Sequence, residues 1–210
     1  MGIEDDLAGC EESDPYICIL DENDVNLEQY CLLWTHLCRI MNNWGTVFSF
    51  VVKDVTGKIV KLEEMQADKP QHYSSVLKMA QFEKENETIR KKKPRSGCGQ
   101  LIILNRAFEF VIDLLHNVFS EKDEAAKVSK IAQHSYDRTL SKHHSWVVQK
   151  VVWAALCTLP YREEFVASLR GNMPAENDEK FHETFDKNGR EILKRVGQMI
   201  EQFELVDFHP

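Results

Sequence analysis

The sequence lacks any long hydrophobic run. In 210 residues, no window approaches the 18 or so uninterrupted apolar residues that a membrane-spanning helix requires. The start of the chain also lacks the charged and apolar segments of a secretion signal, and Asp6 stands where a myristoylation signal has Ser or Thr. These absences predict a soluble protein of the cytosol.

Paired cysteines are missing as well. The six cysteines form no CxxC pair and have no histidines at zinc-site spacing, so the sequence predicts no disulfide framework, no metal site and no cofactor. Nor does any serine or cysteine stand in a recognisable set with a base, and no second carboxylate pairs with Asp54. No catalytic residues are therefore predicted.

Acidic residues outnumber basic residues, 34 to 26, which gives a net charge of −8. This balance argues against nucleic acid as the main partner, because binding a phosphate backbone needs a broad basic face. One local exception is "RKKKPRSG" at residues 90–97, where five cations crowd into a link broken by proline. The cluster is either a solvated helix end, favoured by the helix dipole, or a patch that docks on anionic membranes.

Helical periodicity is the main feature that the sequence does contain. Apolar residues recur at helical spacing, short polar or Pro/Gly links separate the segments, and no period of 20 to 50 residues repeats. We expect an acidic and partly mobile arm over 1–24 and one all-α domain over 25–210. The pattern predicts helices at about 27–41, 46–65, 72–90, 100–119, 123–140, 145–157, 162–170 and 178–206.

The segment 101–119 is apolar around most of its circumference. A helix of this kind usually lies between two layers of other helices. Part of its apolar surface can instead face a space that a ligand fills, and periodicity alone does not separate these two interpretations.

The stretch "TVFSFVVKDVTGKIVK" at 46–61 combines hydrocarbon with charge. At helical spacing, Val47, Val51, Asp54, Lys58 and Lys61 form one stripe that is apolar at one end and charged at the other. Asp54 and Lys58 are then either a surface ion pair or the polar mouth of a pocket for an amphiphile.

A second informative stretch, "HHSWVVQKVVWAALCTLPYREEF", opens with His143 and His144. A histidine at a helix start is usually a capping or surface residue, and a tryptophan such as Trp146 is usually part of the core. These residues alone carry little functional information.

Together, "GTVFSFVVKDVTGKIVK", "SGCGQLIILNRAF" and "HHSWVVQKVVWAALCTLPYREEF" resemble three signature segments of the glycolipid transfer protein superfamily, over residues 25 to 206. The likeness is greatest to its ceramide-1-phosphate transfer branch. The resemblance implies a two-layer α-helical sandwich with lipid chains between the layers. It also implies a monomeric, non-enzymatic sphingolipid carrier that touches membranes containing anionic lipids transiently.

The resemblance also implies roles for individual residues. Asp54 would bind the sphingoid amide and hydroxyl, His144 the acyl-amide carbonyl, and Lys58 the headgroup, with Lys61 and Arg106 as further headgroup candidates. Residues at the membrane-contact face would be Trp146, Lys91, Lys92, Lys93 and Arg95.

Two positions depart from both branches. The ceramide-1-phosphate branch has arginines where this chain has Gly99 and Ile103, and the glycolipid branch has a tryptophan platform for the first sugar at the position of Ile103. The headgroup, phosphate or sugar, therefore stays open. If the phosphate site is incomplete, arginine at both positions should raise affinity for ceramide-1-phosphate.

Three functional hypotheses follow. The first is a sphingolipid carrier centred on Asp54, Lys58 and His144. The second is a lipid sensor or binding module with the same pocket and little transfer activity. The third is a hydrolase that uses Asp54 and His144 as an acid–base pair.

Overall fold

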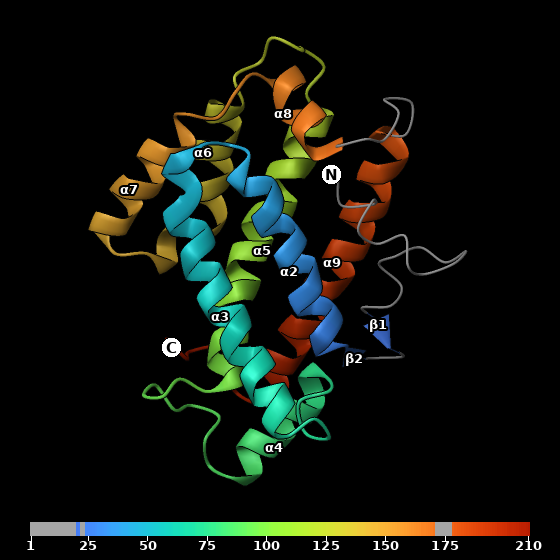
Figure 1. Ribbon diagram of the computed structural model, residues 1–210, viewed down its shortest axis with the longest axis vertical. Coiled ribbons are helices and arrows are strands. Elements are labelled where there is room, and N and C mark those ends of the chain that lie inside the picture. Colours follow the sequence, from blue (N-terminus) through green and yellow to red (C-terminus); the bar gives the residue numbers. More distant parts are fainter. Residues whose placement is uncertain (1–19, 22–23, 171–177) are drawn as a thin grey trace.

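The computed structural model describes residues 20–21, 24–170 and 178–210, and Figure 1 shows that helices build the molecule. This architecture confirms the all-α prediction. The elements are β1 (Leu20–Asp21), β2 (Asp24–Val25), α2 (Leu27–Asn42), η2 (Thr46–Phe48), α3 (Ser49–Asp68), α4 (Val76–Glu85), α5 (Gly97–Ser120), α6 (Val128–Thr139), η3 (Ser141–His143), α7 (Trp146–Leu156), α8 (Arg162–Arg170) and α9 (Asp178–Gln202).

The central element is α5, which packs against α3, α4, α6 and α9, while α2 pairs with α3 over it (Figure 1). At its middle, the fully buried Phe108 meets the rings of Tyr30 and Trp34 on α2 edge to face, at centroid distances of 6.2 and 5.9 Å. Phe185 on α9 packs against the other side of the same ring at 6.4 Å. Aromatic contacts of this geometry therefore join three helices in the core.

The helix starts follow from side-chain caps. Ser96 accepts a hydrogen bond from Gly99 N at 3.0 Å, and the buried carboxylate of Glu83 accepts from Gly97 N and Cys98 N at 2.6 and 3.0 Å. These acceptors satisfy amides that a helix N-terminus leaves unpaired. As a result, α5 begins at residue 97 rather than at 100.

Other predicted segments also differ from the structure. The helix predicted over 123–140 covers only Val128–Thr139. The segment predicted over 46–65 begins with the short η2 turn and continues as α3 to Asp68. The helix predicted over 72–90 covers only 76–85, because Ser75 caps its start and Glu87, with φ of 57°, leaves the helical region after its end. Hydrophobic spacing alone did not indicate these local stops.

The segment 1–24 lies mostly outside the described residues, so its predicted mobility remains a prediction. Its last residue, Asp24, forms hydrogen bonds to the helical domain. Asp24 Oδ1 accepts a hydrogen bond from Leu77 N on α4 at 3.0 Å, and Arg195 on α9 donates to Asp24 O at 3.0 Å. The boundary expected between 24 and 25 therefore falls within the short strand β2.

Helix α9 approaches α5 closely at Gly189. A Cβ atom at this position would lie 2.2 Å from Cδ1 of Ile112, so a larger residue would require the Ile112 side chain to shift. In the part of the chain that the structure describes, no helix combines the length and apolar character needed to cross a bilayer.

Candidate functional site

A cavity of about 600 Å³ lies between the α2–α3 pair on one side and α5 and α7 on the other. Most of its wall is aliphatic or aromatic, as expected of a space that accepts hydrocarbon. Representative lining residues are Leu37 and Met41 of α2, Val55 of α3, Phe110 and Leu114 of α5, and Val152 of α7. One side of α5 thus belongs to the core and another side to the cavity.

Charged residues also line the cavity, beginning with an ion pair on α3. Lys58 Nζ lies 2.6 Å from Asp54 Oδ2 and 3.2 Å from Asp54 O. The Lys58 side chain is only 9 % exposed, whereas that of Asp54 is 69 % exposed. Asp54 thus leaves carboxylate surface open to a ligand, and a buried cation lies directly behind it.

His144 lies within electrostatic reach of this pair. Its Nδ1 is 2.8 Å from the Tyr136 hydroxyl. Burial lowers the pKa of His144, with Asp54 opposing and Lys58 adding to this effect, so the ring is neutral at pH 7. A hydroxyl that donates to Nδ1 leaves the proton on Nε2, the tautomer that can donate to a carbonyl oxygen.

Arg106 and His143 contribute further polar groups to the cavity wall. Arg106 Nη2 donates to Phe208 O at 3.1 Å, and burial lowers the pKa of this guanidinium, which stays charged. Burial, followed by the charge of Arg106, lowers the pKa of His143 to about 4. His143 is therefore neutral beside a fixed positive charge.

Arg95 also lines the cavity, although the sequence suggested a membrane-contact role for it. It is half-buried, and its Cγ lies 2.8 Å from the point where a Cβ at residue 99 would stand. The Arg95 side chain thus occupies space that Gly99 leaves open. Its Nε is buried and has no hydrogen-bond partner among the described residues. The sequence does not indicate this placement, because a glycine at a position where the resemblance implies an arginine suggests only that a cation is missing.

The structure separates the remaining predicted residues into two groups. Ile103 lines the cavity beside these cations. Lys61 lies outside the lining and forms an ion pair with Glu64 at 2.6 Å, so it does not join Asp54 and Lys58. The side chains of Lys91, Lys92 and Lys93 are exposed, whereas Arg90 at the start of this basic link pairs with Asp207 at 2.9 Å.

Helix α7 lies at the edge of the molecule (Figure 1) and carries exposed apolar side chains, which together we call the α7 face. Trp146 is 70 % exposed, and Trp153, which the sequence analysis did not single out, is 43 % exposed. Val147 and Val151 belong both to this face and to the cavity wall. The face is defined by Trp146, Val147, Val151 and Trp153.

The geometry does not favour the hydrolase hypothesis. The contact that orients His144 is to the Tyr136 hydroxyl, whereas Asp54 is paired with Lys58. An acid–base pair needs its two members within hydrogen-bond reach of the reacting group and of a group that orients the base. The arrangement instead provides an apolar cavity and a polar rim.

Comparison with known proteins gives consistent matches. The family model described as glycolipid transfer protein matches residues 25–171. The human ceramide-1-phosphate transfer protein is 32 % identical over 164 residues, which cover 76 % of each chain. These relatives are transfer proteins rather than enzymes, which confirms the expectation that the chain is not an enzyme.

Solved structures agree with the sequence matches. The apo form of mouse ceramide-1-phosphate transfer protein superimposes with a TM-score of 0.84 at 27 % identity, covering 91 % of this chain and 94 % of that one. The human protein in complex with 12:0 ceramide-1-phosphate gives 0.83 at 28 % identity, covering 92 % and 94 %. The chain therefore belongs to the glycolipid transfer protein family.

Proposed function

We propose that the chain binds a sphingolipid with a phosphate headgroup, such as ceramide-1-phosphate, and transfers it between membranes. The observation that carries the proposal is the apolar cavity whose wall also holds three cationic side chains: Lys58, Arg95 and Arg106. The human relative whose structure contains 12:0 ceramide-1-phosphate supports the choice of ligand class.

The cavity accounts for the lipid chains. Exposing a methylene group to water costs about 0.8 kcal/mol, so two free acyl-length chains in water would make exchange prohibitively slow. A space of about 600 Å³ between helix layers offers those chains an apolar environment during transit. The protein thus lowers the barrier by binding, without a covalent step.

Asp54 and His144 account for selection of an amide-linked lipid. The exposed carboxylate of Asp54 can accept hydrogen bonds from the amide N–H and a neighbouring hydroxyl, while His144 can donate to the amide carbonyl. A diacylglycerol lipid has no N–H at this position. Its binding would leave a polar group without a partner, a penalty of about 1 to 3 kcal/mol.

The charge balance favours a phosphate over a sugar. A phosphate monoester carries nearly two negative charges, and the cavity wall contains Lys58, Arg95 and Arg106 against the single carboxylate of Asp54. Arg95 adds a cation from the link before α5, and its Cγ lies 2.8 Å from where a Cβ at Gly99 would stand, a position where the resemblance implies an arginine. A sugar would instead need an aromatic platform, and Ile103 cannot provide one.

Membrane contact is the second part of the proposal. The α7 face presents two tryptophans, the residue type enriched at the boundary between lipid and water. The exposed Lys91, Lys92 and Lys93 would add about 1 kcal/mol each near an anionic surface. Since Val147 and Val151 join this face to the cavity, a lipid can move between membrane and pocket there. We propose that the protein acts as a cytosolic monomer that visits membranes transiently.

A vesicle-to-vesicle transfer assay tests this function. Labelled ceramide-1-phosphate should move faster than phosphatidic acid, which lacks the amide, and faster than galactosylceramide, which lacks the phosphate. Arg95→Gln should slow ceramide-1-phosphate transfer about tenfold or more, whereas Lys91→Gln in the same link serves as the matched control on neutral vesicles. Preferential transfer of galactosylceramide would contradict the phosphate assignment.

One observation supports a sensor function as the second candidate. Lys58 is already paired with Asp54, and Gly99 and Ile103 stand at the two helix positions where the resemblance implies arginines. A lower affinity for the headgroup can suit a protein that senses a lipid rather than transfers it. Tight binding of ceramide-1-phosphate together with negligible transfer would select this alternative.

A further inference from the structure

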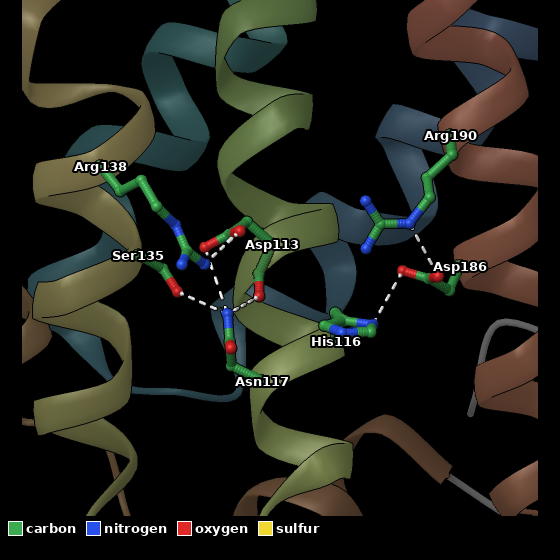
Figure 2. A network of polar contacts seen from close by, with 7 residues as sticks. All are labelled: Asp113, His116, Asn117, Ser135, Arg138, Asp186 and Arg190. Carbon is green, nitrogen blue, oxygen red and sulfur yellow. Dashed lines mark hydrogen bonds and ion pairs between the residues drawn. The ribbon is translucent and has the colours of Figure 1, made fainter.

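Two histidines and an aspartate converge between α5 and α9, outside the cavity lining. His116 comes from α5, and His182 and Asp186 come from successive turns of α9. One ligand atom from each residue lies within 4.8 Å of the other two. Figure 2 shows His116 directed toward Asp186, with Nδ1 3.4 Å from Oδ1. Imidazole nitrogens and a carboxylate oxygen are ligands that zinc accepts.

Packing holds the three side chains in place. The His182 ring stacks on Phe119 with centroids 4.7 Å apart and an interplanar angle of 15°. Gly189, one turn beyond Asp186, permits the close approach of α9 to α5 at Ile112, which lies one turn before His116. The helix spacing that brings the ligands together is therefore fixed by the core.

Two of the polar atoms in this cluster lack partners. His182 Nε2 and Asp186 Oδ1 are buried and make no hydrogen bond in the part of the chain that the structure describes. His116 Nδ1 lies at ion-pair distance from Oδ1 but does not satisfy that oxygen with a hydrogen bond. Leaving such atoms unpaired costs about 1 to 3 kcal/mol each, and a bound cation would remove that cost.

Arg190 orients the carboxylate without using its inward oxygen. Its Nε donates to Asp186 Oδ2 at 2.8 Å, which leaves Oδ1 directed at His116 (Figure 2). Hydrogen bonds of this outer kind commonly fix the orientation of ligating carboxylates. The Arg190 side chain is 53 % exposed, so solvent screens much of its positive charge from the site.

We infer that His116, His182 and Asp186 form a binding site for a transition-metal dication of the zinc type, which clamps α9 to α5. The donor set of two nitrogens and one oxygen favours Zn²⁺ over Ca²⁺ or Mg²⁺, which prefer oxygen ligands throughout. The role is structural, because a metal that binds the native state and not the unfolded chain stabilises the fold. No spacing pattern in the sequence indicates this site, because the ligands come from distant segments.

The test uses the full chain after treatment with a chelator. The exposed thiol of Cys157 can also bind zinc, so the measurements are made in a Cys157→Ser background. Isothermal titration with Zn²⁺ at pH 7.5 should show a site that His116→Gln and His182→Gln each weaken at least tenfold. His134→Gln changes an exposed histidine of α6 and should leave the affinity unchanged.

A second readout is thermal unfolding. Saturating Zn²⁺ should raise Tm by several degrees, and the rise should disappear in His116→Gln and at pH 5.5, where protons compete for the imidazoles. Because the His116 side chain is 46 % exposed, its variant should remain folded. Equal zinc affinity and an equal Tm rise in wild type and His116→Gln would overturn the inference, as would equal stabilisation by Mg²⁺. Neither readout depends on lipid transfer.

Discussion

Lys58 and Asp54 form an ion pair at 2.6 Å in which the lysine is the buried partner and the aspartate the exposed one. A pair that served only the surface would expose both side chains. The arrangement therefore places a cation in the wall of the cavity and turns the carboxylate toward an incoming ligand.

Replacing Asp54 with Val tests this role. Transfer of ceramide-1-phosphate should fall about 10- to 100-fold, because a hydrogen bond to a charged group contributes about 1.5 to 3 kcal/mol. The helical circular dichroism should not change, although some stability is lost because the buried Lys58 ammonium loses its carboxylate partner. Lys61→Ala breaks the Lys61–Glu64 pair on the same helix and is the control. Unchanged transfer in Asp54→Val would reduce the residue to a surface ion-pair member.

The space above Gly99 yields a second prediction. In Gly99→Ala, the new methyl group would stand 2.8 Å from Arg95 Cγ and 3.2 Å from Pro210 Cβ. We expect the Arg95 side chain to be displaced and ceramide-1-phosphate affinity to fall several-fold, as measured by lipid titration. Gly99→Arg should behave in the same way, so adding arginine here does not simply restore a missing cation.

Gly57→Ala provides the matched control, since a Cβ at that position on α3 meets no atom within 4 Å. Removing a glycine from a helix interior should stabilise the fold by about 0.5 to 1 kcal/mol and leave binding unchanged. If Gly99→Ala gained affinity instead, the placement of Arg95 in the headgroup site would be wrong.

His143 predicts a pH dependence of stability. Its pKa is about 4 in the folded chain, lowered by burial and then by Arg106 and Lys142, against about 6.5 when unfolded. Between these values the unfolded chain binds a proton that the folded chain does not, so this contribution to stability is present above pH 6.5 and is lost as pH falls to 4.

Urea unfolding at several pH values measures this effect. His143→Gln should make the fall in stability between pH 6.5 and 4 shallower, whereas His134→Gln on the surface of α6 should not. Identical slopes in wild type and His143→Gln would show that the ring is not held neutral in the folded chain.

The two parts of the membrane surface should respond differently to vesicle charge. Trp146→Ala with Trp153→Ala removes apolar anchors and should slow transfer from neutral and anionic vesicles alike. Lys91, Lys92 and Lys93 changed together to Gln should slow transfer mainly from anionic vesicles, and added salt should slow the wild type in the same manner.

Controls for this prediction come from other surfaces. Val60→Ala removes an apolar side chain that is 41 % exposed on α3, and Lys180, Lys187 and Lys194 lie on α9, at the opposite edge of the molecule from α7 in Figure 1. Neither Val60→Ala nor the replacement of Lys180, Lys187 and Lys194 together with Gln should affect transfer. Equal slowing of the Lys91–Lys93 variant on both vesicle types would show that this segment is only a helix end.

The sequence predicted features that depend on residues close together in the chain. The stripe containing Asp54 and Lys58 follows from helical spacing, and His144 lies within electrostatic reach of both. Arg95 could not be placed in this way, because its side chain occupies the space that Gly99 leaves open. The cluster of His116 with His182 depends on how two helices pack, which no local pattern encodes.

The most direct test of the central claim is native mass spectrometry of the protein after equilibration with mixed vesicles containing ceramide-1-phosphate, galactosylceramide and phosphatidic acid in equal amounts. We predict one bound lipid per chain, predominantly ceramide-1-phosphate, with the adduct strongly reduced in Arg95→Gln and in Asp54→Val. A predominant galactosylceramide adduct, or ceramide-1-phosphate bound equally well by both variants, would contradict the proposed binding site.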